Sequence, residues 1–348
     1  MFRIPGKYYL TLLRSAIVAL LMVLSCNINI MLAQAPQFSQ FYASPLYLAP
    51  SFAGATDGSR ITLNYRNQWP SLPGTFVTYA FGFDHYFHDY NSGVGLLLFR
   101  DQAGSANLAT TNAGILYSYN FKLNNNWILR PGIHFLYSQR TIDYNKLVFG
   151  DQISLDGDGL PSTQTSLPME KIDYFDASAS LVAYKNNIWA GFTFDHLMTP
   201  DQSMTNQENH VPMKISLFGG YRFMLSRPLA GVTEESISLT FLYKNQGPFN
   251  QFDLGAYWTK EPVSIGLLYR GIPIFNSPVY GTFNNDAVVL MAALRTESFR
   301  IGYSYDFTIS RLLGSTGGSH EISIIYQFNQ GPPDRAPTSI PCPTSPYR

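Results

Sequence analysis

Serine, histidine and glutamate stand next to one another near the end of this sequence, as Ser319, His320 and Glu321. A hydrolase would need such residue types to meet on one wall of the fold. The string lies in a stretch that alternates like a β-strand, and neighbouring side chains of a strand point to opposite faces. Ser319 and His320 therefore cannot easily pair, and no G-x-S-x-G motif is present. We expect no enzyme activity, and the structural interpretation of His320 is a hydrogen bond where a loop meets a strand.

Carboxylates around Asp151, Asp156 and Asp158 could bind calcium. This string lacks the spacing and the bidentate glutamate of an EF-hand loop, so a solvated turn is the favoured interpretation. Cys26 and Cys342 are the only cysteines, too few for a cysteine-based metal site or a disulfide framework. The sequence has no G-x-G-x-x-G, Walker or H-E-x-x-H motif, and we predict no metal and no cofactor.

The charge balance excludes another class of function. The sequence has 23 basic and 23 acidic residues, a formal net charge of zero, and no basic run. Nucleic acid is therefore not an expected partner. Aromatic residues make up 15% of the chain and charged residues only 13%, which is a poor balance for a soluble surface. It suits the aromatic girdles that barrels place at two membrane interfaces.

The N-terminus is typical of a secretory signal. Basic residues precede the apolar run 16–24, and small and polar residues follow around Ala33. We predict a signal peptide over residues 1–33. The next longest apolar run, 287–294, is too short to span a membrane as a helix. Cys26 loosely resembles a lipid-attachment site, but a whole barrel needs no acyl anchor.

Apolar and polar residues alternate along most of the remaining chain, for example in residues 61–66, 175–181 and 300–307. Such segments are unsuited to a large soluble core, but they can face lipid on one side and a polar lumen on the other. In lipid every backbone polar group must be paired, so the strands must close into a barrel. We therefore predict an all-β fold, a transmembrane antiparallel outer-membrane β-barrel of about 14 strands. The expected strands are residues 60–67, 76–86, 92–100, 108–120, 127–140, 174–184, 188–195, 213–224, 236–244, 250–259, 262–269, 285–295, 299–307 and 319–328.

Titratable side chains at inward positions of these strands are expected to face the lumen. They are Arg66, His134, Asp176 and Asp306. On the lipid face an Arg or Lys at mid-strand would cost roughly 2 to 4 kcal/mol. One interpretation of Arg66 is a pair with an inward carboxylate such as Asp306, and the other is a contact with a passenger protein.

The links between the expected strands alternate in length. Every second link is mostly a short turn, whereas the others include the long links 141–173, 196–212 and 270–284. In outer-membrane barrels the short turns are periplasmic and the long loops are extracellular. We therefore expect both termini in the periplasm, although the link 225–235 is longer than this rule requires.

Two segments are expected to lie outside the strands of the barrel, which would comprise residues 60–328. Residues 34–59 are apolar and contain prolines without good alternation, so we predict a plug of the lumen or a periplasmic segment. Residues 329–348 are rich in proline and are expected to form an extended periplasmic tail. That tail is either a contact with another protein or a disordered end.

Several strings together resemble the PorP/SprF family of the type IX secretion and gliding machinery of Bacteroidota. They are QFSQFYASPLYLAPSFAG at 37–54, the Tyr-Arg-x-Gln-Trp hairpin at 65–84, GVGLLLFRDQAG at 93–104, NIWAGFTFDHL at 187–197, TGGSHEISIIYQF at 316–328 and Cys-Pro at 342–343. The sequence departs from the family pattern at Ser44, Ala49 and Phe41, where the family has two asparagines and a tyrosine. The residues that carry the resemblance are Gln37, Phe38, Gln40, Pro45, Pro50, Gly54, Arg66, Gln68, Trp69, His196, Gly318, His320 and Glu321.

The resemblance implies an outer-membrane protein that is not an enzyme. It would bind type IX secretion or gliding proteins, or export and anchor a secreted surface adhesin, while its outer face contacts outer-membrane lipid. The alternative is an outer-membrane transport barrel for small solutes, which an open lumen lined by the four inward residues named above would favour. A third candidate is an outer-membrane hydrolase whose activity depends on His320.

Overall fold

The structure is a computed structural model of the chain. It describes residues 36–74, 76–123, 126–153, 168–205, 208–226, 235–276, 283–310, 314–329 and 339–344. The predicted signal peptide, Cys26 and the carboxylates Asp156 and Asp158 lie outside the described residues.

Alternation in the sequence becomes alternation of faces in the strands. In β1 (Ser59–Gln68), Thr62, Asn64 and Arg66 are buried, whereas Leu63 is exposed on the other face. The same alternation runs through the other long strands because side chains of an extended backbone point to opposite sides in turn. Those strands are β2 (Phe76–Phe87), β3 (Ser92–Ala103), β4 (Leu108–Tyr119), β6 (Ile128–Thr141), β7 (Lys171–Lys185), β8 (Ile188–Asp195), β9 (Lys214–Ser226), β10 (Glu235–Gln246), β11 (Phe249–Lys260), β12 (Val263–Asn276), β13 (Phe283–Arg295), β14 (Phe299–Thr308) and β15 (Ser319–Phe328).

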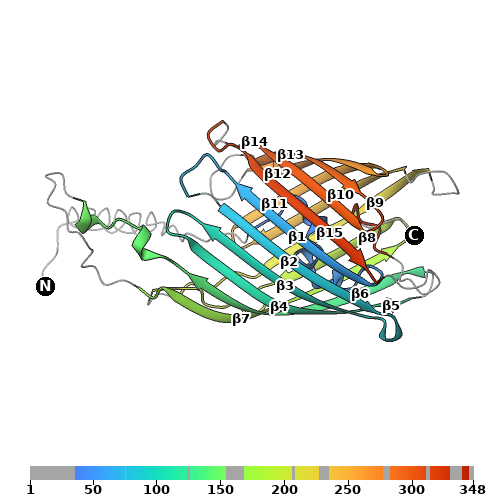
Figure 1. Ribbon diagram of the computed structural model, residues 1–348, viewed down its shortest axis with the longest axis horizontal. Coiled ribbons are helices and arrows are strands. Elements are labelled where there is room, and N and C mark those ends of the chain that lie inside the picture. The colour runs from blue at the N-terminus through green and yellow to red at the C-terminus, as the bar shows by residue number, and fades with distance from the viewer. Residues whose placement is uncertain are drawn as a thin grey trace, which may run out of the picture. The chain divides into compact units, whose positions relative to one another are not determined.

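The strands close on themselves without a free edge. Each long strand pairs antiparallel with its neighbours in the chain, and β1 pairs with β15 over ten residues from Ser59 to Gln68. The two-residue strand β5 (Phe121–Lys122) pairs with the start of β6, while β4 pairs with the rest of β6. The result is a closed antiparallel barrel of fourteen long strands, and Figure 1 shows them tilted across the barrel.

The predicted barrel is confirmed, and each of the fourteen expected strands corresponds to one long strand. The largest difference is β12, which continues to Asn276 although alternation in the sequence ends near residue 269. Register shifts after Arg270 and after Ile272 let this strand continue. Strand β5 was not expected, because the chain leaves the β4 ladder at Asn120 and rejoins β6 for only two residues.

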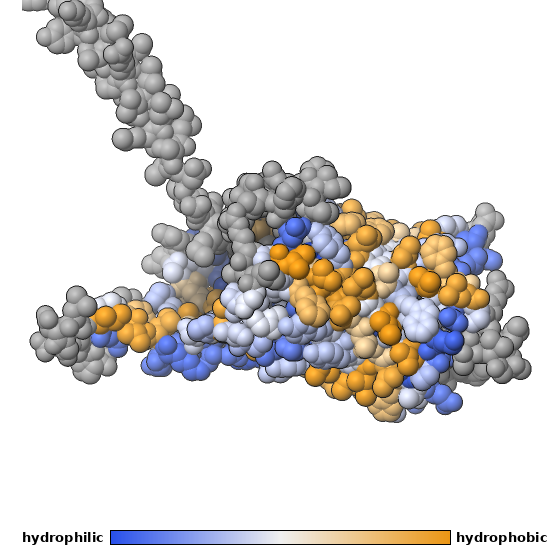
Figure 2. All heavy atoms as spheres, turned by 90° about the horizontal axis from the view of Figure 1, so that it is seen from above, coloured by the Kyte–Doolittle hydropathy of each residue, from blue (hydrophilic) through white to orange (hydrophobic). Residues whose placement is uncertain are grey.

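Apolar side chains cover the outside of the barrel. Figure 2 shows them gathered over one face of the barrel, with hydrophilic residues toward its ends. Exposed examples on different strands are Ile115, Phe135 and Phe175. In the described part of the chain, no helix is both long and apolar enough to cross a membrane.

The two ends of the barrel differ in their connections. At the short-turn end, where β1 begins and β15 ends, the links include residues 186–187 and 261–262. At the long-loop end the links include residues 142–170 and 196–213. This alternation of short and long links follows the pattern expected from the sequence.

The segment that precedes β1 lies inside the barrel, where Figure 1 shows it in dark blue. Residues 36–57 are called the plug here. They form three short helical turns, η1 (Phe41–Ala43), α2 (Pro45–Leu48) and η2 (Pro50–Phe52), and two of these turns begin at a proline. Nearly every plug side chain is buried, including Phe38, Leu46 and Phe52. The apolar composition of this segment, without strand alternation, is explained by packing on all sides.

The plug runs along the lumen from one end of the barrel to the other. Its first residues contact Lys244 and Glu321, which lie near the long-loop end of their strands. Its last residues reach the short-turn end, where Asp57 binds His88 at 2.9 Å. The first described residues of the plug therefore lie in the long-loop half of the barrel.

The described part of the C-terminal tail packs inside the barrel. Ile340 and Cys342 are buried and belong to the same apolar cluster as Tyr42 and Trp189. Residues 340–344 lie against the plug and the wall, through hydrogen bonds of Thr344 with Tyr42 and of Arg222 with Cys342.

The plug lies so close to the wall that β6 has no room for a side chain at Gly132. A Cβ there would lie 2.3 Å from the backbone nitrogen of Ser51. We expect Gly132→Ala to lower the free energy of unfolding by about 1 to 3 kcal/mol, because overpacking forces the backbone to move. Urea unfolding in detergent micelles, followed by tryptophan fluorescence, measures this.

Gly150→Ala is the matched control, because nothing lies within 4 Å of a Cβ at that position. Equal stabilities of the two variants would contradict the seating of the plug on β6.

Candidate functional site

The inner wall of the barrel carries buried charges at the ends of strands that meet the plug. Arg66 lies near the end of β1, Arg270 on β12, Asp306 near the end of β14 and Glu321 near the start of β15. Their positions in the alternation point them inward, and all four are at most 2% exposed. Together with Ser39 of the plug they are called the Arg66 cluster.

Ser39 lies at the centre of the Arg66 cluster. Its hydroxyl donates to Asp306 Oδ2 at 2.7 Å and accepts from Arg66 and Arg270 at 2.6 and 2.7 Å. Its backbone N–H donates to Glu321 Oε2 at 2.7 Å, and the N–H of Gln40 donates to Glu321 Oε1 at 3.0 Å. One carboxylate thus binds two successive backbone amides of the plug.

Ion pairs join the wall residues of the cluster to one another. Arg66 lies 2.8 Å from Asp306 and 3.2 Å from Glu321, and Arg270 lies 3.0 Å from Asp306. Asp253 lies 3.6 Å from Arg270 and is also buried. Buried charges are costly unless they are paired and hydrogen-bonded, so the plug completes a set of interactions that the wall alone leaves unfinished.

Two further arginines hold the plug nearer the short-turn end. Arg130 donates to the carbonyl oxygens of Ser51 and Ala53 at 3.1 and 2.7 Å. Arg60 pairs with Asp84 at 2.9 Å, and the same carboxylate accepts from the N–H of Gly54 at 2.7 Å. Carbonyl and amide groups of the plug that have no partner in a helix or sheet are therefore satisfied by the wall.

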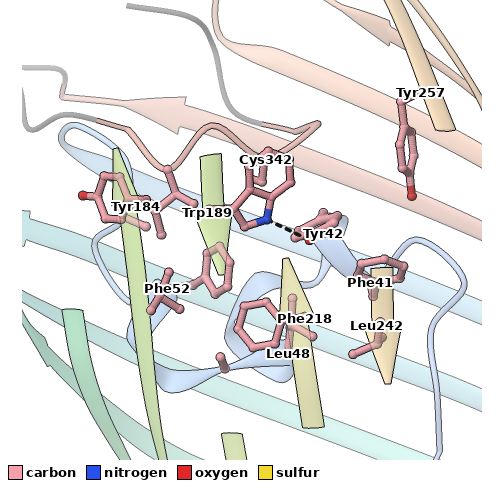
Figure 3. Packing of buried hydrophobic residues seen from close by; sticks show 14 of the residues in the cluster. Phe41, Tyr42, Leu48, Phe52, Tyr184, Trp189, Phe218, Leu242, Tyr257 and Cys342 are labelled. Atoms are coloured by element: carbon pink, nitrogen blue, oxygen red, sulfur yellow. Dashed lines mark hydrogen bonds between the residues drawn. The ribbon is translucent and has the colours of Figure 1, made fainter. Parts of the chain in front are cut away.

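An aromatic cluster fixes the middle of the plug, as Figure 3 shows. Trp189 of β8 donates from its indole nitrogen to the hydroxyl of Tyr42 at 2.9 Å. Thr344 of the tail donates to the backbone oxygen of Tyr42 at 2.9 Å, and Arg222 donates to the backbone oxygen of Cys342. The tail thus contacts both the plug and the wall.

Tyr47 of the plug lies between Phe38 and Phe99, with its ring stacked on Phe99 at 4.9 Å. Burial raises the pKa of Tyr47 to about 12, and Lys214 nearby opposes this only in part. The phenol donates a hydrogen bond to the backbone oxygen of Pro36.

Residues of the family motif near the N-terminus lie in the plug. Gln37 accepts from Lys244 at 3.1 Å, and Gln40 donates to Ser304 and to the backbone oxygen of Glu321. Pro45 and Pro50 begin helical turns. Gly54 has φ +61°, and a Cβ there would lie 2.7 Å from the backbone of Gly93.

Other motif residues form the rim at the long-loop end. Gln68 ends β1, and the next residue, Trp69, donates from its backbone N–H to the oxygen of Gly318 at 2.9 Å. His320 points outward and lies 2.8 Å from the hydroxyl of Tyr303. Ser319 is buried on the opposite face, so serine and histidine are not brought together.

The four residues predicted to face the lumen are all buried, but they lie in different places. Arg66 and Asp306 meet in the Arg66 cluster. Asp176 instead lies 2.6 Å from Nδ1 of His196 and ties the link 196–213 to the wall. His134 joins neither group.

Sequence reasoning missed Ser39, Arg130 and Arg270, which make much of the contact between plug and wall. The sequence does contain an indication for two of them, because Arg130 and Arg270 occupy inward positions in alternating strands. Marking every inward basic residue, rather than a few, would have found both of them.

The chemistry of this interface is binding. Among the described residues, no group of three or more His, Cys, Asp or Glu side chains could hold a metal ion. The charged groups of the Arg66 cluster are paired with each other and with plug atoms.

Fold and interior define the class of this protein as an outer-membrane β-barrel with a plugged lumen. The family described as "Type IX secretion system membrane protein PorP/SprF" matches residues 30–326, and the chain belongs to this family. The family is one of secretion-system membrane proteins and is not a known enzyme family. No curated protein sequence matches the chain.

Solved barrels resemble the chain only remotely. A monoaromatic hydrocarbon channel, the TodX deltaS2S3 mutant, is 10% identical with a TM-score of 0.45 and covers 80% of this chain and 92% of its own. A FadL homologue of Pseudomonas aeruginosa is 13% identical with a TM-score of 0.44, over 82% and 94% of the two chains. The KdgM porin is 8% identical with a TM-score of 0.35, over 78% and 99%. These likenesses carry no argument about function.

Removing one carboxylate from the Arg66 cluster tests its role. We expect Asp306→Asn to lower the free energy of unfolding by about 3 to 5 kcal/mol, because it removes the carboxylate that Arg66 and Arg270 share and leaves these buried guanidinium groups with less compensating charge. Chemical unfolding in detergent micelles measures the loss.

Asp143→Asn is the control, because Asp143 and Lys146 form an exposed pair at 3.9 Å whose loss costs under about 1 kcal/mol. If Asp306→Asn lowers the free energy of unfolding no more than the control does, the Arg66 cluster does not stabilise the fold.

Proposed function

We propose that this barrel acts in type IX secretion by binding protein partners, with its lumen kept closed by the plug. The partners are secretion or gliding proteins, or a secreted surface protein that the barrel anchors. It catalyses no reaction. The long loops are extracellular, and the short turns and the C-terminal tail are periplasmic.

The observation that carries this proposal is the plug bound to the wall inside the barrel. A plug bound through Glu321, Arg130 and Asp84 crosses the interior from end to end, and side chains of the wall bind its backbone directly. What a partner can reach is then the loops, the turns and the outer surface.

The transport alternative loses its support for the same reason. An open lumen lined by Arg66 and Asp306 would favour small-solute transport. Both of these side chains instead bind Ser39 of the plug. Family membership places the chain with secretion-system membrane proteins and says nothing of a solute.

Apolar side chains on the link 142–170 offer a surface for a protein partner. Val148, Ile153 and Met169 are 70%, 65% and 54% exposed, although they lie in a link between strands and not on a strand face. The base of this link is fixed by a hydrogen bond from the N–H of Asp143 to the oxygen of Ala106 at 3.0 Å. Exposed apolar groups at such a place are typical of protein contacts.

Purification from outer membranes in mild detergent, followed by mass spectrometry, tests the proposal. We expect wild type to recover type IX components or a surface protein, and the triple variant Val148→Ser, Ile153→Ser, Met169→Ser to lose at least about tenfold in recovery. Tyr90→Ser is the control, because Tyr90 is equally exposed but lies at the short-turn end.

Equal recovery by the triple variant would contradict the loop as the contact surface. A wild-type barrel that purifies alone, with the surface proteome unchanged in a strain lacking the gene, would overturn the proposed function.

A disulfide between the plug and the wall distinguishes the binding function from the transport function. The hydroxyls of Ser51 in the plug and Ser180 in β7 lie 2.6 Å apart, so Ser51→Cys with Ser180→Cys places two thiols within bonding reach. We expect the oxidised variant to recover partners as wild type does and to remain closed in planar bilayers. Partner recovery or ion conductance that is lost on oxidation and restored by reductant would show that the plug must move.

A further inference from the structure

The outer face of the barrel contains a groove on β1, β2, β3, β4 and β15. Its volume is about 390 Å³. Outward side chains make most of its lining, and Leu63, Tyr79, Leu98 and Ile322 are each between 42% and 50% exposed. These residues come from four neighbouring strands, so the groove crosses the barrel wall sideways rather than following one strand.

Strand register arranges the groove in two rows. The row nearer the short-turn end is called the lower row. In it, Ile324 pairs with Leu63, Leu63 with Phe81 and Phe81 with Leu98. It contains no polar side chain. Rows on one face of a strand are about 7 Å apart, because alternate residues share a face.

The upper row lies one step nearer the long-loop end and has a different chemistry. It pairs Ile322 with Tyr65, Tyr65 with Tyr79, Tyr79 with Arg100 and Arg100 with Thr111. Two tyrosines at this level are typical of an aromatic girdle at a membrane interface.

The next row beyond them confirms where the apolar surface ends. In this row His320 pairs with Asn67, Asn67 with Val77, and Val77 with Gln102. The upper row of the groove therefore lies at the boundary between apolar and polar surface.

Arg100 is the unusual member of the groove. It faces outward and is exposed, and among the described residues it donates a hydrogen bond to the hydroxyl of Thr111 at 3.3 Å. In the described part of the chain no carboxylate pairs with it. Other arginines of the barrel, such as Arg66 and Arg270, are buried and paired with carboxylates.

We propose that this groove binds a membrane lipid with an anionic phosphate headgroup. An acyl chain lies over the aliphatic lower row, and the guanidinium of Arg100 binds the phosphate at the level of the two tyrosines. Guanidinium groups bind phosphate through two parallel hydrogen bonds, which a headgroup at the interface can accept.

Charge and position favour a lipid over a protein partner. The groove lies on the wall of a closed barrel, where the surrounding surface is apolar and in contact with membrane lipid. A cation beside an apolar hollow, at the boundary of the apolar surface, matches a molecule with an acyl chain and a negative head. This inference depends on the membrane location and not on the identity of any protein partner.

Native mass spectrometry of the full protein in detergent tests this site with two probes, dioleoyl phosphatidylglycerol and dioleoyl phosphatidylcholine. We expect wild type to retain the anionic lipid about fivefold more than the zwitterionic one. Arg100→Gln is expected to remove that preference. Leu63→Trp, which fills the apolar lower row, is expected to reduce retention of both lipids.

Lys122→Gln is the control, because Lys122 is an exposed cation at the short-turn end and does not line the groove. The proposal is overturned if Arg100→Gln keeps the preference, if the control loses it equally, or if wild type retains neither lipid. Far-UV circular dichroism verifies that each variant is folded.

Discussion

The interior of this barrel is governed by the cost of burying charge. Closing fourteen long strands creates a lumen whose wall carries several arginines and carboxylates, and each must have a partner once water is displaced. The hydroxyl of Ser39 binds three of these groups at once. The backbone N–H groups of Ser39 and Gln40 both donate to the carboxylate of Glu321. Wall and plug therefore satisfy each other, and neither is a complete structure alone.

The same relation explains the composition of the plug. A segment without regular helix or strand has many backbone groups that need partners, and Arg130, Asp84 and Ser180 provide them from the wall. Between these polar contacts the plug is apolar and packs against inward aromatic rings such as Trp189. Glycines such as Gly132 allow the two backbones to approach.

Much of the barrel could be predicted from the sequence, because alternation of apolar and polar residues is a local property that a membrane barrel enforces along every strand. Arg66 and Asp306 were placed inward for that reason, and the structure brings them within 2.8 Å. The plug contacts could not be predicted in the same way. Ser39 and Glu321 are separated by 282 residues, and no local pattern indicates which inward carboxylate a loop segment will bind. The proline-rich composition of the tail likewise describes local conformation and does not indicate where residues 340–344 pack.

Glu321, near the C-terminal end of the chain, has two neighbours from near the N-terminal end. In the register of β15 with β1 it stands opposite Arg66, and its carboxylate also binds the backbone of the plug just before β1. The last strand to be synthesised therefore closes the wall and fastens the plug with the same residue. A barrel in which the plug is not seated leaves the carboxylate at its closing seam without the two amide N–H groups that donate to it, while its ion pair with Arg66 of the wall remains.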